Sequence, residues 1–190
     1  MAFITHALPG LTRSTVPRTS RFIHATSPTM LLSKGDKMPM DVDLMVLKDG
    51  APTTVSTASI FQSKKVAVVT FPGAFTSTCQ NGHVPLWIKA VDDFKAKGCD
   101  DVVALAVNDP FVMDAFANVI GNEGKVTFLA DGGAKLTKAI GIEVDTDGFG
   151  GVRSYRGGYL VEDGVFTQVN LEDGTSFEGP SKPETLLAQM

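Results

Sequence analysis

One of the two cysteines of this chain stands where a thiol can become reactive. Cys79 ends the segment Phe71–Cys79 (FPGAFTSTC), which follows the apolar run Val66–Thr70 and precedes a helical pattern. Unpaired N–H groups in the first turn of a helix stabilise negative charge and so favour the thiolate, the nucleophilic form of cysteine. The placement therefore predicts a nucleophile, and a small buried hydrophobic residue is the alternative for a free cysteine.

Pro72 and Thr76 strengthen the prediction of a reactive site. Pro72 has a fixed φ and biases Phe71 toward extended backbone, so a strand should stop there and the chain should turn before Thr76. Thr76 precedes Cys79 by three residues, which places both side chains on one face of a helix. Its hydroxyl could then hydrogen-bond a ligand held over the sulfur, or it could simply cap the helix.

The elements that must position these residues alternate between strands and helices. Five short runs rich in Val, Phe or Leu predict strands at Val66–Phe71, Val102–Val107, Val126–Leu129, Gly158–Val161 and Val165–Val169. Helical spacing covers Val84–Phe94, Pro110–Ile120 and Ala134–Ile140. The last two strands should form a hairpin through residues 162–164. This order predicts an α/β fold with a mixed sheet flanked by helices, for which a thioredoxin-like arrangement is one economical solution.

The composition fits a single soluble domain and excludes several partners. The chain has 190 residues, 43% of them hydrophobic, and a formal net charge of −4. Its longest apolar runs are five or six residues, against about 20 needed to span a bilayer, so we expect no membrane partner. Dispersed Lys and Arg argue against nucleic acid. The three histidines form no ligand cluster with the cysteines, and we expect neither a metal nor a cofactor.

The first 30 residues predict a targeting segment. They contain three arginines and many Ser and Thr, and no acidic residue occurs before Asp36, which is typical of an organellar transit peptide. Arg21–Thr26 (RFIHAT) resembles the Arg-x-apolar-x-x-Thr/Ser/Gly pattern of two-step mitochondrial processing, which would leave Leu31 near the mature N-terminus. We predict a transit peptide over residues 1–30, a domain over residues 31–190 and a mitochondrial matrix location. A plastid address and a cytoplasmic protein with an unaddressed tail are the alternatives.

The extended motif resembles the active-site segment of peroxiredoxins. Pro72-Gly73-Ala74-Phe75-Thr76-x-x-Cys79, followed by His83-x-Pro85, is similar to that segment in the type II subfamily, which includes peroxiredoxin 5. Ala106–Val112 (AVNDPFV) resembles the Val-Asn-Asp strand end of the subfamily, and Gly151–Arg156 (GVRSYR) precedes a predicted strand as the family's arginine does. The resemblance runs from about residue 33 to the C-terminus.

The resemblance implies a thiol peroxidase with a thioredoxin-like fold that reduces hydrogen peroxide and alkyl hydroperoxides. Cys79 would be the peroxidatic cysteine, whose thiolate attacks one peroxide oxygen and becomes a sulfenic acid. Thr76 and Arg156 would hydrogen-bond the peroxide oxygens, and Pro72 would shield the pocket from water. These roles make physical sense, because charge moves onto the leaving oxygen and a fixed cation with oriented donors stabilises it.

Two arginines compete for the role of that cation. Arg156 lies two glycines before a predicted strand, at the register the family uses, so we prefer it to Arg153, which we expect on the surface. Many relatives carry an aromatic residue where Gly157 stands, so the local packing should differ. For His83, one helical turn beyond Cys79, pocket lining and a structural hydrogen bond remain equally open.

The second cysteine bears on how the sulfenic acid is reduced. Relatives with an internal resolving cysteine place it at registers held here by Ala104 and by Gly174–Gly179. Cys99 lies beyond the helix that begins near Cys79, and a straight helix would put the two sulfurs on the order of 25–30 Å apart. A disulfide needs Cα atoms within about 7 Å. We predict a one-Cys cycle regenerated by glutathione with glutaredoxin, or by thioredoxin.

Redox sensing is the alternative function, in which oxidation of Cys79 alters binding to a partner protein. A thioredoxin-like disulfide reductase is disfavoured, because Thr76 occupies the first position of the Cys-x-x-Cys pair that it needs. The resemblance further implies a homodimer through the face around Phe75 and the Asn108–Phe111 segment.

Overall fold

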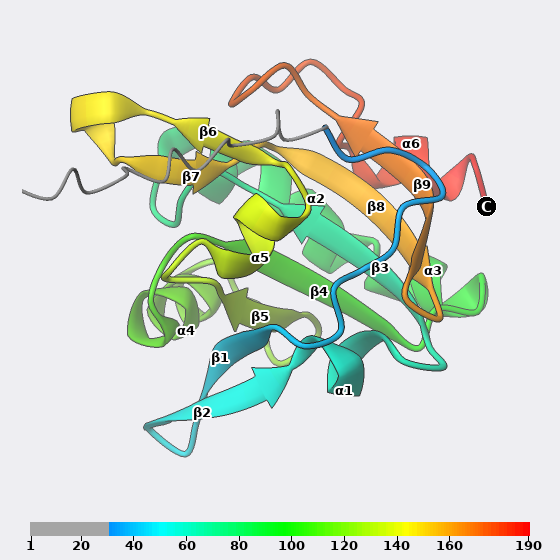
Figure 1. The fold of residues 1–190 in the computed structure, drawn as a ribbon, viewed down its shortest axis with the longest axis horizontal. Helices are drawn as coiled ribbons and strands as arrows, with labels where there is room; N and C mark the ends of the chain where they lie inside the picture. Colours follow the sequence, from blue (N-terminus) through cyan, green and yellow to red (C-terminus); the bar gives the residue numbers. More distant parts are fainter. Residues whose placement is uncertain (1–30) are drawn as a thin grey trace, which may run out of the picture.

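A mixed seven-stranded sheet forms the centre of the protein (Figure 1). Its strands are β1 Asp43–Lys48, β2 Ala51–Ser56, β3 Lys65–Thr70, β4 Asp101–Ala106, β5 Thr127–Ala130, β8 Gly157–Glu162 and β9 Val165–Leu171. This computed structural model describes residues 31–190, and the predicted transit peptide lies outside them. The strand order is β2-β1-β5-β4-β3-β8-β9. Strands β3, β4 and β5 run parallel, whereas the other neighbours are antiparallel.

The structure confirms the predicted α/β fold and all five predicted strands, whose ends move by at most two residues. The predicted hairpin is also present, since β8 and β9 pair through a turn in which Asp163 and Gly164 have φ values of 44° and 74°. Sequence patterns missed β1 and β2. Strand β2 is an exposed edge strand that contains Pro52, so it lacks the apolar alternation that marks a half-buried strand.

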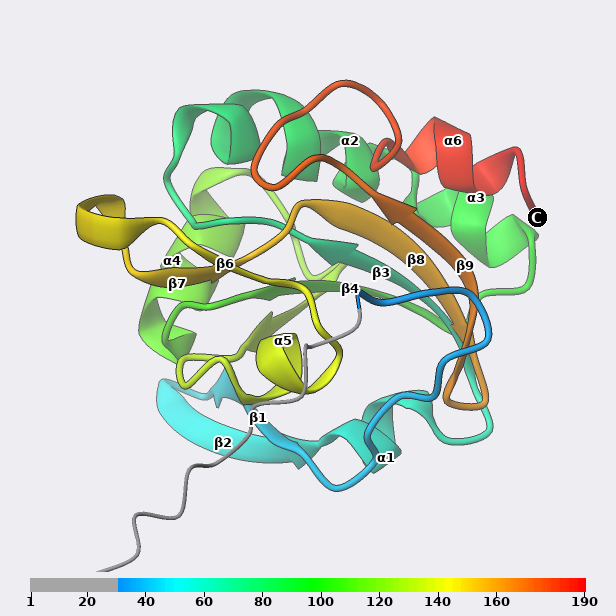
Figure 2. The same ribbon diagram turned by 45° about the horizontal axis from the view of Figure 1, so that its top comes forward.

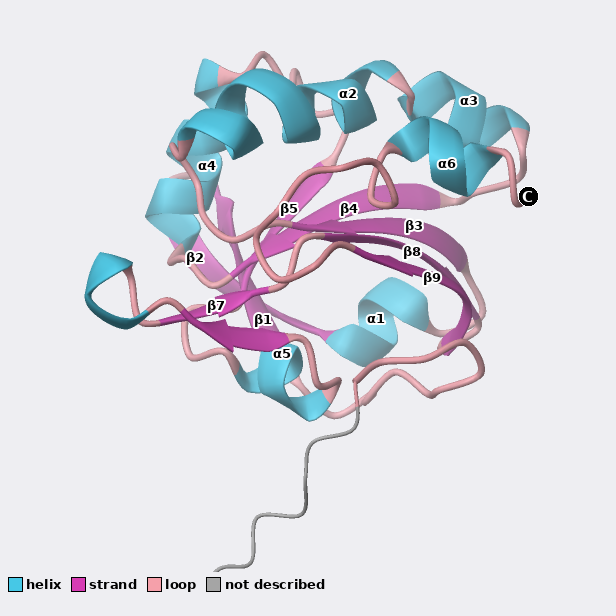
Figure 3. Cartoon of the chain, turned by 90° about the horizontal axis from the view of Figure 1, so that it is seen from above, coloured by secondary structure: helices cyan, strands magenta, loops and turns pink. Residues whose placement is uncertain are grey.

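Helices cover both faces of the sheet, as Figure 3 shows from above. One face carries α2 Val84–Lys89, α3 Val91–Ala96, α4 Pro110–Val119 and α6 Pro183–Leu187, and the other carries α1 Thr57–Phe61 and α5 Lys135–Ala139. Consecutive residues of β3 alternate between these layers: Ala67 and Val69 join the core under α2 and α4, while Val66 and Val68 join the core under α1 and α5. A central strand buried on both sides reads as a continuous apolar run, which is why β3 was predictable. None of the helices in the described part of the chain is long and apolar enough to cross a membrane.

The turn after β3 places Cys79 at the start of a helical segment, as the sequence predicted. Pro72 has no N–H group to continue the sheet, and the chain turns through Phe75, whose φ is 64°. Helical backbone begins at Ser77 and widens into a π-helical turn, η1 Cys79–His83. In this turn the Val84 N–H bonds Cys79 O, five residues back. The wide turn ends at His83, two residues before Pro85, which cannot donate the bond that a regular helix needs there.

The antiparallel pairing of β8 with β3 brings Arg156 to the same end of the sheet. Thr70 pairs with Gly157, so Arg156 lies beside the turn that leads to Cys79. Just before it in the chain, β6 Glu143–Asp145 and β7 Val152–Ser154 form a second, two-stranded sheet. Its tip, the 3-10 turn η2 Asp147–Phe149, projects from the body of the protein, at the upper left of Figures 1 and 2.

Candidate active site

Cys79 is completely buried and lies against a guanidinium group. Its Sγ accepts a hydrogen bond from Arg156 Nη1 at 3.4 Å. Arg156 is itself only 2% exposed. Within residues 31–190 no ion pair neutralises this arginine. The charge of Arg156 is therefore available to a thiolate at Cys79, and burial of both groups reduces screening by water.

Three further acceptors hold the Arg156 side chain in place. Its Nε donates to Ser176 O at 2.8 Å, and Nη2 donates to Thr175 O at 3.2 Å. Nη1 also lies 3.1 Å from His83 Nδ1. Because a guanidinium presents its donors in a rigid plane, these three contacts leave one orientation for the bond to Cys79 Sγ.

His83 is a buried, neutral partner of Arg156. Its Nε2 donates to Ser181 O at 3.1 Å, which leaves Nδ1 as the acceptor for Arg156. Burial, together with the positive charge of Arg156, lowers the pKa of His83 to about 3. Trp87 Nε1 donates to the same Ser181 O at 3.0 Å. Of the two interpretations that the sequence left open, the structure supports the hydrogen-bonding one.

A pocket of about 340 Å³ reaches this cluster at Arg156, whereas Cys79 and His83 are not among its lining residues. It is lined by Pro72, Thr76, Ser77, Thr78, Thr146, Phe149, Arg153, Arg156 and Thr175. Thr76 Oγ1 donates to Gly73 O at 3.0 Å, so the helix cap considered from the sequence is not the bond that the hydroxyl makes. Its oxygen keeps lone pairs for a ligand donor. The structure thus brings the four predicted site residues Pro72, Thr76, Cys79 and Arg156 to one place.

Arg153 does not lie on an open surface, contrary to the expectation from the sequence. It is half-buried and lines the same pocket as Arg156. Its Nε donates to Gly150 O at 2.9 Å and its Nη1 to Val107 O at 2.8 Å. These bonds join the β6–β7 hairpin to the end of β4. Arg153 is thus a second arginine in the lining of the pocket.

Phe149 was missed by the sequence analysis, because it stands inside a glycine-rich run that suggests only a flexible turn. Phe149 is 82% exposed as a residue and is one of the residues that line the pocket. No local pattern could identify it, since its place depends on how the β6–β7 hairpin folds over the helix start. The pocket therefore has one large apolar side chain at its mouth.

The space around Gly157 leaves no room for a side chain. A Cβ at Gly157 would collide with the ring and hydroxyl of Tyr159, which lies two residues on and on the same face of β8. Tyr159 is fully buried, and its hydroxyl is 3.0 Å from Thr70 Oγ1. Tyr159 thus fills the space that an aromatic residue at position 157 would need.

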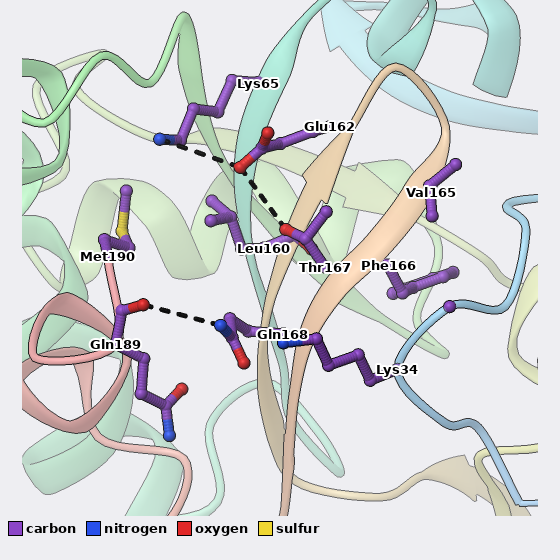
Figure 4. Close-up of a pocket in the computed structure, with 11 residues that line it drawn as sticks. Lys34, Lys65, Leu160, Glu162, Val165, Phe166, Thr167, Gln168, Gln189 and Met190 are labelled. Atoms are coloured by element: carbon purple, nitrogen blue, oxygen red, sulfur yellow. Dashed lines mark hydrogen bonds and ion pairs between the residues drawn. The ribbon is translucent and has the colours of Figure 1, made fainter.

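A second cavity, of about 510 Å³, lies between β8, β9 and the C-terminal residue (Figure 4). Two of its polar side chains have partners within the lining: Lys65 Nζ lies 3.8 Å from Glu162 Oε1, and Gln168 Nε2 donates to the backbone carbonyl of Gln189 at 3.5 Å. Cys79 and Arg156 do not line it. Nothing in its lining suggests redox chemistry.

Neither cysteine forms a disulfide, and Cys99 is poorly suited to redox chemistry. Cys79 and Cys99 are both free and buried, and η1, α2 and α3 separate them along the chain. Burial raises the pKa of Cys99 to about 11, so this thiol stays protonated at neutral pH. The two registers where relatives carry a resolving cysteine have other roles here. Ala104 is a buried residue of β4, and the loop of residues 174–179 supplies backbone carbonyls that bond Arg156.

Comparison with known proteins shows the family of this chain. The family model described as Redoxin matches residues 33–185. Peroxiredoxin-2E, chloroplastic, from Arabidopsis thaliana is 37% identical over 176 residues, covering 90% of this chain and 74% of that protein. The chain belongs to the peroxiredoxin family. Peroxiredoxin-2F, mitochondrial, from the same plant is 36% identical over 139 residues, covering 73% of this chain and 69% of the relative.

A solved peroxiredoxin structure has the same fold. Reduced Prx3 in complex with H₂O₂ from Vibrio vulnificus matches with a TM-score of 0.78 at 40% identity, over 84% of this chain and 99% of that one. These relatives confirm the resemblance to type II peroxiredoxins and the thioredoxin-like fold. This peroxiredoxin is a thiol-dependent peroxidase, and its relatives include chloroplastic and mitochondrial proteins.

Proposed function

We propose that Cys79 reduces hydroperoxides through a sulfenic acid and that a thiol from another molecule regenerates it. One observation carries this proposal: Arg156 donates to Cys79 Sγ through Nη1 at 3.4 Å and also lines the neighbouring pocket. A guanidinium in that place stabilises the thiolate and presents donors to an arriving peroxide oxygen.

The first step is a two-electron oxidation of the sulfur. The Cys79 thiolate attacks the terminal oxygen of a hydroperoxide, an S–O bond forms and the O–O bond breaks. The leaving hydroxide or alkoxide takes a proton from solvent and departs as water or an alcohol. Negative charge moves from sulfur to the leaving oxygen during this step, so donors aimed at the oxygens lower the barrier.

Three pocket residues take the remaining roles. Arg156 holds both the thiolate and the peroxide, because it lines the pocket and its four bonds leave one of its five N–H donors, on Nη2, for a peroxide oxygen. Thr76 Oγ1 already donates to Gly73 O, so it accepts a hydrogen bond from the peroxide O–H. Pro72 is buried in the pocket wall and offers no N–H to water.

Regeneration uses two external thiols. The first attacks the sulfenic sulfur and releases water, which leaves a mixed disulfide on Cys79. The second attacks that disulfide, restores the Cys79 thiol and leaves as the oxidised disulfide. We assign this role to glutathione with glutaredoxin, or to thioredoxin. The protonated, buried thiol of Cys99 supports an external donor over an internal one.

The site of action that we propose is the mitochondrial matrix, supported by the arginine-containing, acid-free residues 1–30 and by the mitochondrial relative. Fusion of residues 1–30 to a fluorescent protein tests it: mitochondrial fluorescence is expected, and plastid or cytoplasmic fluorescence would refute it.

We also propose a homodimer. Phe75 and Phe111 are exposed on neighbouring segments, which the bond from Ala74 N to Asn108 Oδ1 at 3.0 Å joins. Sedimentation of Phe111→Asp against the parent protein tests that contact.

Stopped-flow oxidation tests the catalytic proposal. The protein contains a single tryptophan, the buried Trp87, whose indole shares Ser181 O with His83 and can report on the site through its fluorescence. The parent protein should react with hydrogen peroxide several orders of magnitude faster than free cysteine, and Cys79→Ser should not react. A Cys79→Ser variant that reacts as fast as the parent would refute the assignment.

A further inference from the structure

The loop between β9 and α6, residues 172–182, is the element that holds Arg156 in place. Thr175 O and Ser176 O accept bonds from its guanidinium, and Gly174 O accepts the Arg156 backbone N–H at 3.0 Å. Phe177 covers the same group, with its ring centre 5.5 Å from Arg156 Cζ. The orientation of Arg156 therefore depends on the shape of a loop that contains no regular secondary structure.

One buried carboxylate ties that loop together. Glu172 is 5% exposed, and its side chain accepts bonds from Glu178 N at 3.0 Å, Gly179 N at 3.1 Å and Ser181 N at 3.1 Å. The Ser181 hydroxyl donates to it at 2.6 Å. Burial alone would raise the pKa of Glu172, but these four hydrogen bonds outweigh burial and lower it. The group is thus an ionised acceptor for both ends of the loop.

Two sets of hydrogen bonds link the Glu172 carboxylate to the orientation of the Arg156 side chain. Closing the loop between residues 172 and 181 fixes the carbonyls of Thr175 and Ser176, which bond the guanidinium. The carboxylate also binds Ser181, whose carbonyl accepts His83 Nε2–H. That bond selects the His83 tautomer whose Nδ1 accepts from Arg156.

We propose that Glu172 is a positioning residue for the peroxidase reaction, which holds the 172–182 loop closed so that Arg156 points at Cys79. This inference rests on the proposed function of Cys79 and Arg156. Glu172 does not line the pocket, and its carboxylate bonds to Glu178, Gly179 and Ser181 rather than to Cys79 or the guanidinium, so it acts through the loop that holds the arginine.

The test compares Glu172→Gln with Glu178→Gln. Glu178 is an exposed residue of the same loop, and its side chain is not among the hydrogen-bond or ion-pair partners of Arg156 within residues 31–190. Glutamine keeps the size of Glu172, but it is neutral and replaces one acceptor oxygen with a donor. We expect Glu172→Gln to lower the second-order rate constant for oxidation of Cys79 by hydrogen peroxide by about tenfold or more, as expected when a donor to the reacting atoms is misplaced. Glu178→Gln should stay within twofold of the parent. Ser181→Ala, which removes only the hydroxyl donor, should give a smaller loss and serves if Glu172→Gln does not fold.

A double-mutant cycle with Arg156→Gln separates positioning from a general structural role. If Glu172 acts through Arg156, Glu172→Gln should have less than a twofold effect on the rate constant in the Arg156→Gln background, although it still lowers the melting temperature there. A tenfold effect in both backgrounds would overturn the inference, as would a Glu172→Gln variant as fast as the parent. In those cases a fast parent protein leaves the proposed function intact. A parent no faster than free cysteine would overturn both.

Discussion

Replacing Arg156 by glutamine should nearly abolish the reaction with peroxide while the protein stays folded. The side chain donates to Ser176 O at 2.8 Å, Thr175 O at 3.2 Å, His83 Nδ1 at 3.1 Å and Cys79 Sγ at 3.4 Å. A glutamine amide has one donor nitrogen and no charge, so it can replace at most two of these bonds and none of the electrostatic attraction.

The magnitude follows from the two interactions that involve reacting atoms. Loss of a charge-assisted hydrogen bond to the thiolate costs about 1.5–3 kcal/mol. Loss of a donor aimed at charge that develops on oxygen costs about 2.7–4 kcal/mol. The two effects overlap, since one guanidinium supplies both, so we expect about 4 kcal/mol, or a decrease of about 10³-fold in the rate constant. Arg156→Lys keeps the charge but not the planar fork, and should lie between glutamine and the parent.

Arg153→Gln is the matched control. Arg153 lines the same pocket, but its Nε and Nη1 bond to Gly150 O and Val107 O rather than to sulfur. It should slow oxidation less than tenfold. Stopped-flow fluorescence with hydrogen peroxide in excess measures all the variants, and circular dichroism checks that each is folded. An Arg156→Gln variant within fivefold of the parent, or an equal loss in Arg153→Gln, would show that Arg156 does not stabilise the reaction.

Three further predictions concern His83, Phe149 and Cys99. The pKa of His83 is about 3 in the folded protein against 6.5 for an exposed histidine. Its neutral form therefore contributes fully to the free energy of unfolding above pH 6.5, and that contribution falls by up to about 1.4 kcal/mol per pH unit as the pH drops toward 3. Urea unfolding followed by Trp87 fluorescence at pH 7 and 5 should show this loss of unfolding free energy in the parent but not in His83→Gln. An equal loss in both proteins would contradict the prediction. Phe149→Ala should slow a bulky aryl hydroperoxide about tenfold and leave hydrogen peroxide within twofold, because a ring at the pocket rim can contact only an apolar substituent; equal changes would exclude that contact. Cys99→Ser should keep steady turnover with glutathione and glutaredoxin, whereas complete loss would identify Cys99 as a resolving residue.

The segment around Cys79 could be predicted because its structure depends on neighbouring residues. A buried apolar run, a proline without an N–H group and a helical pattern follow one another within about 30 residues, and each acts on the backbone locally. The π-helical turn at Cys79–His83 was not predicted. Strands β1 and β2 were also missed, because burial on β1 and an edge position for β2 arise only when the sheet assembles.

The placement of Cys79 in the sequence determined the candidate nucleophile, and the resemblance to peroxiredoxins pointed to Arg156 by its register before a predicted strand. Only the tertiary structure decided that Arg153 shares the pocket, that His83 is a neutral partner of Arg156 and that Glu172 closes the loop behind it. Arg156 and Cys79 are 77 residues apart, and His83 and Ser181 are 98 apart. Contacts of this kind come from the pairing of β8 with β3 and from burial, which no local pattern encodes.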